Sequence, residues 1–200
     1  MKPLKFLIII LFFNLRFFAQ NELLDSLTLA NHEEYTDLAE ALKDPEKVIK
    51  LTLRKKKYKE FPKEIYQFKN IQYLDLSKNA IKELPDSIVS FKYLQYFSIS
   101  KNGLERLPLN VGKMKALRYI NVNQNDLVRL PYSFGALENL EYADLWSNNL
   151  EEFPETLKNL KKLKSMDLRN ILIPKVNQQN LENELPNAII YFSPPCNCSW

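Results

Sequence analysis

Apolar and polar residues alternate in a repeating order between residues 71 and 162, and the order recurs every 23 residues. Four copies begin at Ile71, Leu94, Leu117 and Leu140. In each copy the first, fourth, sixth, eleventh, fourteenth, eighteenth and twenty-first positions are mostly apolar, an asparagine occupies the ninth and a proline the fifteenth. A fixed period of this length predicts a solenoid built from stacked, near-identical units.

The start of each copy predicts a short strand. In the third copy, Ile120 and Val122 are apolar and alternate with Tyr119, Asn121 and Asn123, so one side of the strand faces a core and the other is open. A single copy cannot bury its apolar side alone. Stacked copies therefore pair their strands in one parallel sheet, and stability becomes a sum of interfaces between neighbours.

The ninth position of each regular copy predicts a row of buried amides. An amide among apolar positions needs partners for its donors and acceptor, and the backbone of adjoining turns supplies them. The row consists of Asn79, Asn102, Asn125 and Asn148. The same position holds Lys56 in a degraded copy before the array and Ile171 in a truncated copy after it, as expected where one neighbour is missing. The prolines of the fifteenth position should turn the chain away from the sheet.

This pattern resembles the leucine-rich repeat family, in its 23-residue class with a Leu-Pro or Phe-Pro step. With a degraded copy at 48–70 and a truncated copy from Leu163, the resemblance covers about two-thirds of the chain, with about six repeats over 48–174. It implies an α/β solenoid with a parallel sheet on the concave face, loops and short helical turns on the convex face, and a cap at each end. It further implies a short, exported array of bacterial type.

The N-terminal residues 1–19 predict a secretory signal peptide. Lys2 and Lys5 precede a run of about ten apolar residues, too short for the roughly 20 that span a bilayer. Cleavage is expected after Ala19, which predicts a periplasmic, cell-surface or secreted protein without a stable membrane span. Arg16 and Phe17 depart from the usual pattern. The alternative is a cytoplasmic scaffold whose uncleaved N-terminus packs on the array.

Residues 20–47 predict a helical N-terminal cap. Asn31 followed by Glu34 gives an N-cap signal ahead of apolar residues at helical spacing, and Pro45 ends the helix. His32 would then lie in the first helical turn, at the surface. Such a helix would cover the core side of the first repeat.

Residues 175–200 predict a C-terminal cap. The segment 175–184 reads as a helix with Val176, Leu181 and Leu185 near one face, and residues 188–192 read as a final strand. The tail carries Cys196 and Cys198, whose C-x-C spacing without nearby histidines does not make a zinc site. An exported chain would leave them free, bridged to each other or paired with another chain.

Charge and composition narrow the classes of function. The net charge of +4 includes three cations of the leader, so the remainder carries 25 basic against 24 acidic groups and predicts no nucleic-acid partner. The three glycines are scattered, which argues against a phosphate-binding loop, and no cofactor is expected. The run 54–57 (Arg-Lys-Lys-Lys) reads as a solvated rim on an edge strand, or as a contact for an anionic partner.

The open side of the sheet carries the candidate site. Stacking places the third, fifth and seventh positions in rows about 4.8 Å apart. The predicted partner-binding residues are Tyr73, Tyr96, Tyr119, Tyr142, Trp146, Asp144, Asp167 and Arg169. Tyrosine and tryptophan are common at interface hot spots, and the resemblance implies a non-enzymatic, monomeric module that binds a protein or other surface macromolecule. The alternative for the tyrosines is that stacked rings only stabilise the sheet.

Asp144 and Asp167 also raise a second, catalytic hypothesis. They should be neighbours in the fifth-position row, and paired carboxylates carry out glycoside hydrolysis. Against a surface glycan hydrolase, an open sheet provides no pocket to raise one pKa. Arg169, Arg118 and Lys164 are also expected near enough to pair with the two aspartates.

Overall fold

The computed structural model describes residues 22–194 of the chain. The predicted signal peptide at 1–19, and the tail cysteines Cys196 and Cys198, lie outside these described residues.

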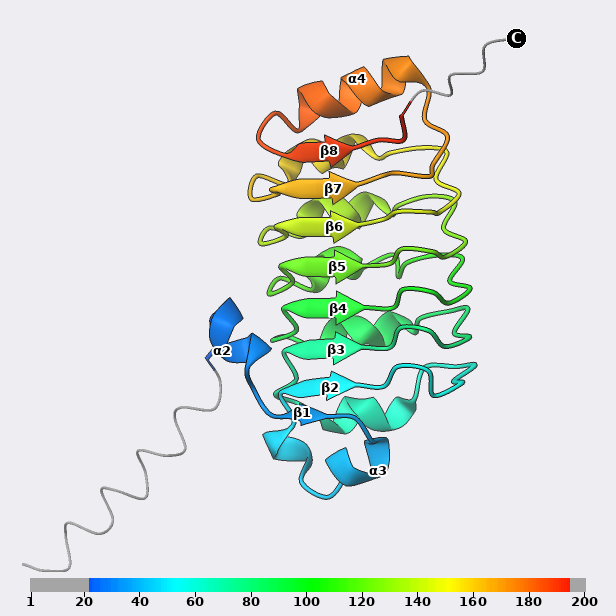
Figure 1. The fold of residues 1–200 in the computed structure, drawn as a ribbon. Coiled ribbons are helices and arrows are strands. Elements are labelled where there is room, and N and C mark those ends of the chain that lie inside the picture. The colour runs from blue at the N-terminus through cyan, green and yellow to red at the C-terminus, as the bar shows by residue number, and fades with distance from the viewer. Residues whose placement is uncertain (1–21, 195–200) are drawn as a thin grey trace, which may run out of the picture.

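Eight parallel strands form one sheet in sequence order, from β1 at one end of the array to β8 at the other (Figure 1). The strands are β1 (Glu34–Tyr35), β2 (Lys50–Thr52), β3 (Tyr73–Asp75), β4 (Tyr96–Ser98), β5 (Tyr119–Asn121), β6 (Tyr142–Asp144), β7 (Ser165–Asp167) and β8 (Ile189–Tyr191). From β2 to β7 each residue pairs with the residue 23 positions later, for example Tyr96 with Tyr119. The predicted solenoid and its register are confirmed.

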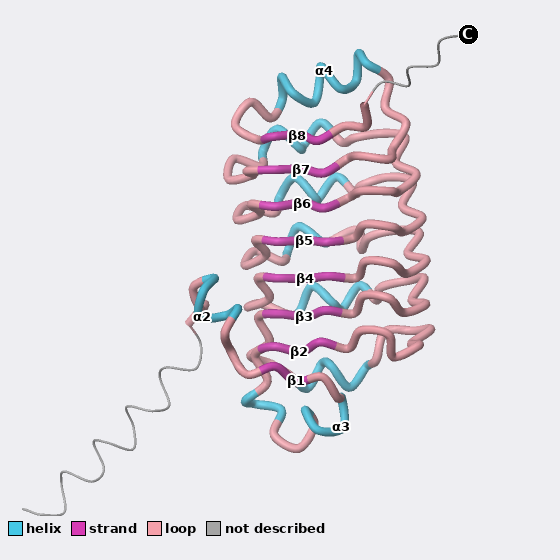
Figure 2. Tube along the Cα trace, viewed as in Figure 1, coloured by secondary structure: helices cyan, strands magenta, loops and turns pink. Residues whose placement is uncertain are grey.

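Short 3-10 helices run along the opposite side of the array from the strands (Figure 2). They are η1 (Pro45–Lys47), η2 (Lys63–Gln67), η3 (Asp86–Ser90), η4 (Val111–Lys113), η5 (Tyr132–Ala136) and η6 (Glu155–Asn159). Pro62, Pro85, Pro131 and Pro154 each occupy the N-cap position of one of these helices. Proline fits there because its fixed φ suits the turn and its missing N–H would lack a helical partner.

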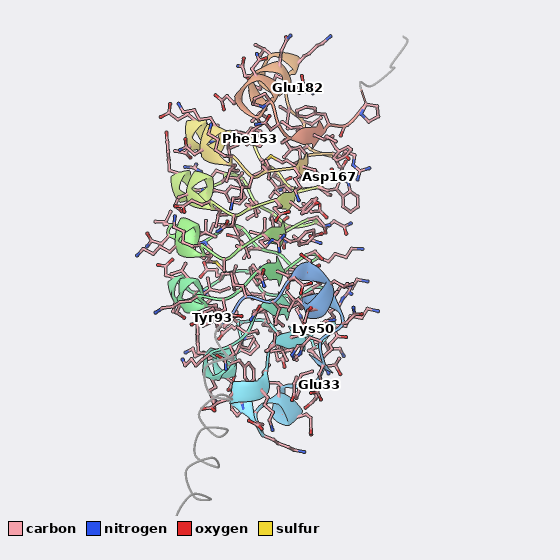
Figure 3. The ribbon with its side chains drawn as sticks, turned by 90° about the vertical axis from the view of Figure 1, so that its left-hand side faces the viewer. Glu33, Lys50, Tyr93, Phe153, Asp167 and Glu182 are labelled. Atoms are coloured by element: carbon pink, nitrogen blue, oxygen red, sulfur yellow. The ribbon has the colours of Figure 1, made fainter. Side chains whose placement is uncertain are left out.

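The core lies between the sheet and the 3-10 helices. Fully buried strand residues such as Leu74, Ile120 and Met166 meet helix residues such as Ile88 and Phe134. Figure 3 views the array from the side, with Asp167 and Lys50 on the strand side and Tyr93 and Phe153 on the helix side. The side of the sheet away from this core, formed by the third, fifth and seventh positions, is called the open face below.

The ninth-position asparagines bond to the backbone of two successive repeats. Each Nδ2 donates to the sixth-position carbonyl of its own repeat and of the preceding one; for Asn125 these are Val122 O at 2.9 Å and Ile99 O at 3.0 Å. Its Oδ1 accepts from the N–H of Leu104 at 3.0 Å. Asn125 and Asn148 are buried, whereas Asn79 and Asn102, nearer the N-terminal end, are half-buried.

The residue before the ninth position adopts a left-handed backbone conformation in all six repeats. The residues at this eighth position are Lys55, Lys78, Lys101, Gln124, Ser147 and Asn170, with φ between 51° and 58°. This conformation is costly for residues with a Cβ, so the turn that leads to the ninth position holds some strain in each of these repeats.

The N-terminal segment differs from its predicted single helix. Two short helices, α2 (Ser26–Ala30) and α3 (Leu38–Ala41), flank strand β1. Asn31 is the C-cap of α2 rather than an N-cap, and Asp37 caps α3 by accepting from the N–H groups of Ala39 and Glu40. His32 lies in the turn between α2 and β1. The capping signature was misread because β1 gains its stability by pairing with β2, which local sequence does not reveal.

The predicted helix and final strand of the C-terminal segment are both present in its described part. Helix α4 (Lys175–Glu184) lies beyond the last repeats, and strand β8 pairs with β7 (Figure 1). Leu181 and Leu185 are buried, but Val176 is mostly exposed and does not share their packed face.

Two glycines allow neighbouring 3-10 helices to approach closely. A Cβ on Gly112 would lie 2.1 Å from the carbonyl oxygen of Ser133, and a Cβ on Gly135 would lie 2.1 Å from that of Thr156. Because both neighbours are backbone atoms, no rotation of a side chain relieves the clash.

Candidate binding face

The third-position tyrosines form a continuous stack of rings along the open face. Tyr73 and Tyr96 have ring centroids 4.1 Å apart with planes 4° from parallel, and Tyr96 and Tyr119 are 4.5 Å apart at 3°. The stack opens at Tyr142, whose ring lies 6.4 Å from that of Tyr119 and is tilted by 41°. Tyr142 is also the most exposed of the four, at 41%. The rings are therefore stacked face to face and half-buried from β3 to β5, and the row is most exposed at β6.

The stack makes its central hydroxyls hard to ionise. Burial, followed by the neighbouring Tyr73, raises the pKa of Tyr96 well above its usual range. Burial, followed by the neighbouring Tyr96, does the same to the pKa of Tyr119. These hydroxyls stay protonated and neutral at physiological pH, where they retain both donor and acceptor capacity.

The fifth and seventh positions change character along the array. In β3 and β4 they hold buried residues: Ser77 donates to Asp75 and lies 2.9 Å from the hydroxyl of Ser98. From β5 to β7 the same rows hold larger side chains that are half-buried or exposed, among them Trp146 and Arg169. The accessible polar and aromatic surface is thus concentrated over β5–β7.

Asp144 and Asp167 are register neighbours, as the row predicts. Asp144 accepts from Asn123 Nδ2 at 2.6 Å, and burial raises its pKa above the ordinary value although that hydrogen bond opposes the shift. Arg169 binds Asp167 with Nη2 at 2.5 Å and Nε at 3.0 Å. Both carboxylates are therefore engaged by neighbouring side chains of the same face.

The expectation that Arg118 and Lys164 pair with these aspartates is wrong. Both cations bind Glu141 instead: Arg118 Nη2 and Nε lie 2.6 and 2.7 Å from Oε1, and Lys164 Nζ lies 2.5 Å from Oε2. These contacts lower the pKa of Glu141, with the hydrogen bond from Lys164 as the largest cause. All three residues occupy the second position of their repeats, a row beside the open face rather than on it.

Segment 22–30 crosses the N-terminal ends of the strands and is held by the same second-position row (Figure 3). The side-chain amide of Gln72 accepts a hydrogen bond from the N–H of Leu24 at 2.9 Å and donates one to the carbonyl of Glu22 at 3.0 Å. Gln95 donates to the carbonyl of Leu24 at 2.8 Å and to the amide oxygen of Gln72. The two glutamines are only 2% and 4% exposed, so they clamp the backbone of this segment against the sheet.

Helix α2 then lies beside the tyrosine row. Arg118 Nη1 donates to Ser26 Oγ at 3.1 Å, and Lys50 Nζ donates to the carbonyl of Ala30 at 2.9 Å. A pocket of about 460 Å³ opens between α2 and the sheet. Its lining consists of Ser26, Leu29, Ala30, Tyr73, Gln95, Tyr96, Arg118, Tyr119, Glu141, Tyr142 and Lys164.

The structure thus brings the four predicted tyrosines to the floor of this pocket but leaves Asp144, Asp167, Trp146 and Arg169 outside its lining. Helix α2, Gln95 and the Arg118–Glu141–Lys164 group of the pocket were not predicted from the sequence. Position alone was the available signal for these second-position residues, because they fall at the same 23-residue spacing. Their connection to segment 22–30 joins residues up to 92 positions apart and has no sequence signature.

Over residues 22–194, no helix is long and apolar enough to cross a membrane. Within the same range, no group of three or more histidine, cysteine, aspartate or glutamate side chains is arranged to hold a metal ion.

Comparison with known proteins agrees with this architecture. The sequence profile of the Leucine Rich Repeat family matches residues 70–91 and 139–160. No curated protein sequence matches the chain.

Among solved structures, a leucine-rich repeat protein of Leptospira interrogans superposes with a TM-score of 0.64 at 29% identity, covering 82% of this chain and 49% of its own. Internalin C2 of Listeria monocytogenes superposes with a TM-score of 0.62 at 20% identity, covering 74% of this chain and 62% of its own. A plant peptide hormone receptor, solved in complex with its peptide RGF2, gives 0.53 at 31% identity over 67% of this chain and 22% of its own.

The chain spans about half the length of the Leptospira protein and less than two-thirds of internalin C2. These proteins share the stacked parallel strands described above, and the profile matches fall on two of the regular repeats. The chain is a leucine-rich repeat protein.

Proposed function

We propose that the protein is a non-enzymatic module that binds a partner protein on the open face of its sheet. The observation that carries the proposal is the aromatic and polar surface over β5–β7, where Tyr142, Trp146 and Arg169 are accessible on a rigid, hydrogen-bonded scaffold. Large side chains already ordered in the free protein lose little entropy on binding, which favours them as anchors. The plant peptide hormone receptor, solved with a peptide, supports a protein or peptide as the ligand class.

The glycan hydrolase hypothesis finds no such support. Arg169 neutralises Asp167, and neither Asp167 nor Asp144 lines the pocket beside α2. A catalytic pair needs one carboxyl group free to donate a proton and a bound substrate between the two, and an open sheet supplies no enclosure for either.

The docking site is tested by comparing Tyr119→Ala with Lys115→Ala. A crosslinking capture from the native cell envelope first identifies the partner, and titration calorimetry then gives its affinity for each variant. Removal of the central ring should cost ~1–3 kcal/mol of binding. Lys115, which lies between η4 and β5 and pairs with Glu138, should alter the association rate and salt dependence more than the affinity.

Tyr119→Ala also lowers stability if the stacked rings support the sheet, so affinity is referred to the folded fraction measured by circular dichroism. An unchanged affinity of the folded Tyr119 variant, or a larger loss in the Lys115 variant, would place the site away from the open face.

Export completes the proposed function, since residues 1–19 have the sequence features of a signal peptide. The intact mass of the protein isolated from its host tests this directly. A chain that begins at Gln20 supports export, whereas a retained leader supports the cytoplasmic alternative.

A further inference from the structure

The pocket between α2 and the tyrosine row combines two different kinds of lining. Leu29 and Ala30 of α2 line the pocket together with the tyrosine rings and make one part apolar. Arg118, Glu141 and Lys164 make the other part charged. A ligand that fills the pocket must therefore carry an apolar group and a polar group within a few ångströms of each other.

The charged part has an excess of positive charge. Two cations share a single carboxylate, because Arg118 binds Oε1 of Glu141 and Lys164 binds its Oε2. Over the described residues, neither cation has a salt bridge to any other carboxylate. Lys164 is 59% exposed and also lies 5.6 Å from the centre of the Tyr142 ring, so its ammonium borders the accessible end of the row. An incoming carboxylate would give this group one anion for each cation.

The neighbouring glutamines show how this edge of the sheet binds polypeptide. Gln72 and Gln95 hold the backbone of residues 22–24 through its N–H and carbonyl groups. Arg118, which donates to Ser26 at the start of α2, and Lys164 continue the same second-position row. A peptide that approached along the row would bring its backbone to the positions where the row changes from amides to cations.

From these observations we infer that the pocket binds the free C-terminal residue of a partner polypeptide, with an apolar side chain against Leu29 and the tyrosines and the carboxylate on Arg118 and Lys164. The inference rests on the proposed function and names the part of the partner that is recognised. Two donors of different shape make the site selective for a carboxylate over an amide, which carries no charge and cannot accept as strongly.

The test uses acetylated tripeptides ending in Leu, Phe, Asp or Lys, each prepared as the free acid and as the amide, with binding measured by titration calorimetry. Free acids ending in Leu or Phe should bind, and their amides should bind about tenfold more weakly or worse, as loss of a charge-assisted hydrogen bond implies. Lys164→Gln should weaken binding of the free acids by about tenfold and leave the affinity for the amides unchanged. Lys115→Gln, which removes a cation outside the pocket, should affect neither.

Glu141→Gln gives the sharpest outcome because its effect has the opposite sign. It removes the competing carboxylate and should tighten binding of the acids severalfold, which simple damage to the fold would not do. Equal binding of acids and amides, no binding of any peptide at millimolar concentration, or weaker binding of the acids by the Glu141 variant would overturn the inference.

Failure of this inference is distinguishable from failure of the proposed function. If Tyr119→Ala weakens binding of the captured partner while the acids and amides bind equally, the open face is the docking site but the pocket does not recognise a C-terminal carboxylate. If the acids bind as expected and Tyr119→Ala leaves the partner unaffected, the partner docks elsewhere.

Discussion

Removal of the Asn125 side chain should destabilise the protein because two backbone N–H groups lose their hydrogen-bond acceptor. In Asn125→Ala, the N–H groups of Leu104 and Asn102 lose the Oδ1 that accepts them at 3.0 and 3.2 Å. The carbonyls are affected less, because Ile99 O keeps its bond from Asn102 and Val122 O keeps its bond from Asn148. The loss therefore falls on donors rather than acceptors.

The burial of these donors sets the magnitude. Leu104 is 0% exposed, so water cannot replace its lost partner, and one buried unsatisfied donor costs ~1–3 kcal/mol. Asn102 is half-buried, and water can partly satisfy its N–H. We expect a total loss of about 2–3 kcal/mol in the free energy of unfolding. With a urea m-value of about 2 kcal/mol/M, the midpoint should fall by roughly 1 M.

Urea unfolding followed by circular dichroism measures this loss, with Lys56→Ala as the matched control. Lys56 occupies the same position of the first repeat but is exposed, with only a 4.0 Å contact to Asp37. Its removal should shift the midpoint by a few tenths of a molar at most. Equal midpoints for the two variants would refute the reasoning that the asparagines stabilise the array through buried backbone groups.

Two further predictions concern packing and ionisation. Gly135→Ala should destabilise the protein by ~1–3 kcal/mol or more, because the new Cβ would meet the backbone of Thr156. Gly103→Ala should be tolerated in the same urea assay, because its nearest neighbours are side-chain atoms at 3.6 and 3.7 Å; equal losses of stability in the two variants would contradict this argument. Burial raises the folded-state pKa of Tyr96 and Tyr119 above the value of about 10 that they have in the unfolded chain, so the unfolded chain loses these protons first. The stability of the fold should therefore be fully present below pH ~10 and should fall as the pH rises further. An ultraviolet titration in which all tyrosines ionise together near pH ~10 would exclude this.

The sequence was sufficient for those features that repeat. A side chain at a fixed position of a 23-residue unit has the same neighbours in every copy, so the register of Tyr73 with Tyr96, or the role of Asn125, follows from the period alone. Helix α4 could also be predicted because it is long enough, at 10 residues, to carry a local pattern.

The features that the sequence did not reveal depend on contacts outside the repeat. Asn31 and Glu34 have the spacing of a capping box, but β1 forms because Glu34 pairs with Lys50 of the first repeat. Likewise, Arg118 was expected to pair with aspartates of the open face, yet Glu141 sits one strand away in its own row and lies closer. Local spacing cannot decide between such competing partners, since their distances depend on which side chains share a row.

The crossing of segment 22–30 over the strand ends has a consequence for how the array folds. In a simple solenoid each unit touches only its neighbours, so the ends can unzip one unit at a time. Here Ala30 is tied to Lys50 in β2, Leu24 to Gln72 and Gln95, and Ser26 to Arg118, the residue before β5. Strands β2 to β5 are thus fastened together by one short segment, so they should open as a single cooperative block, whereas the opposite end remains free to fray.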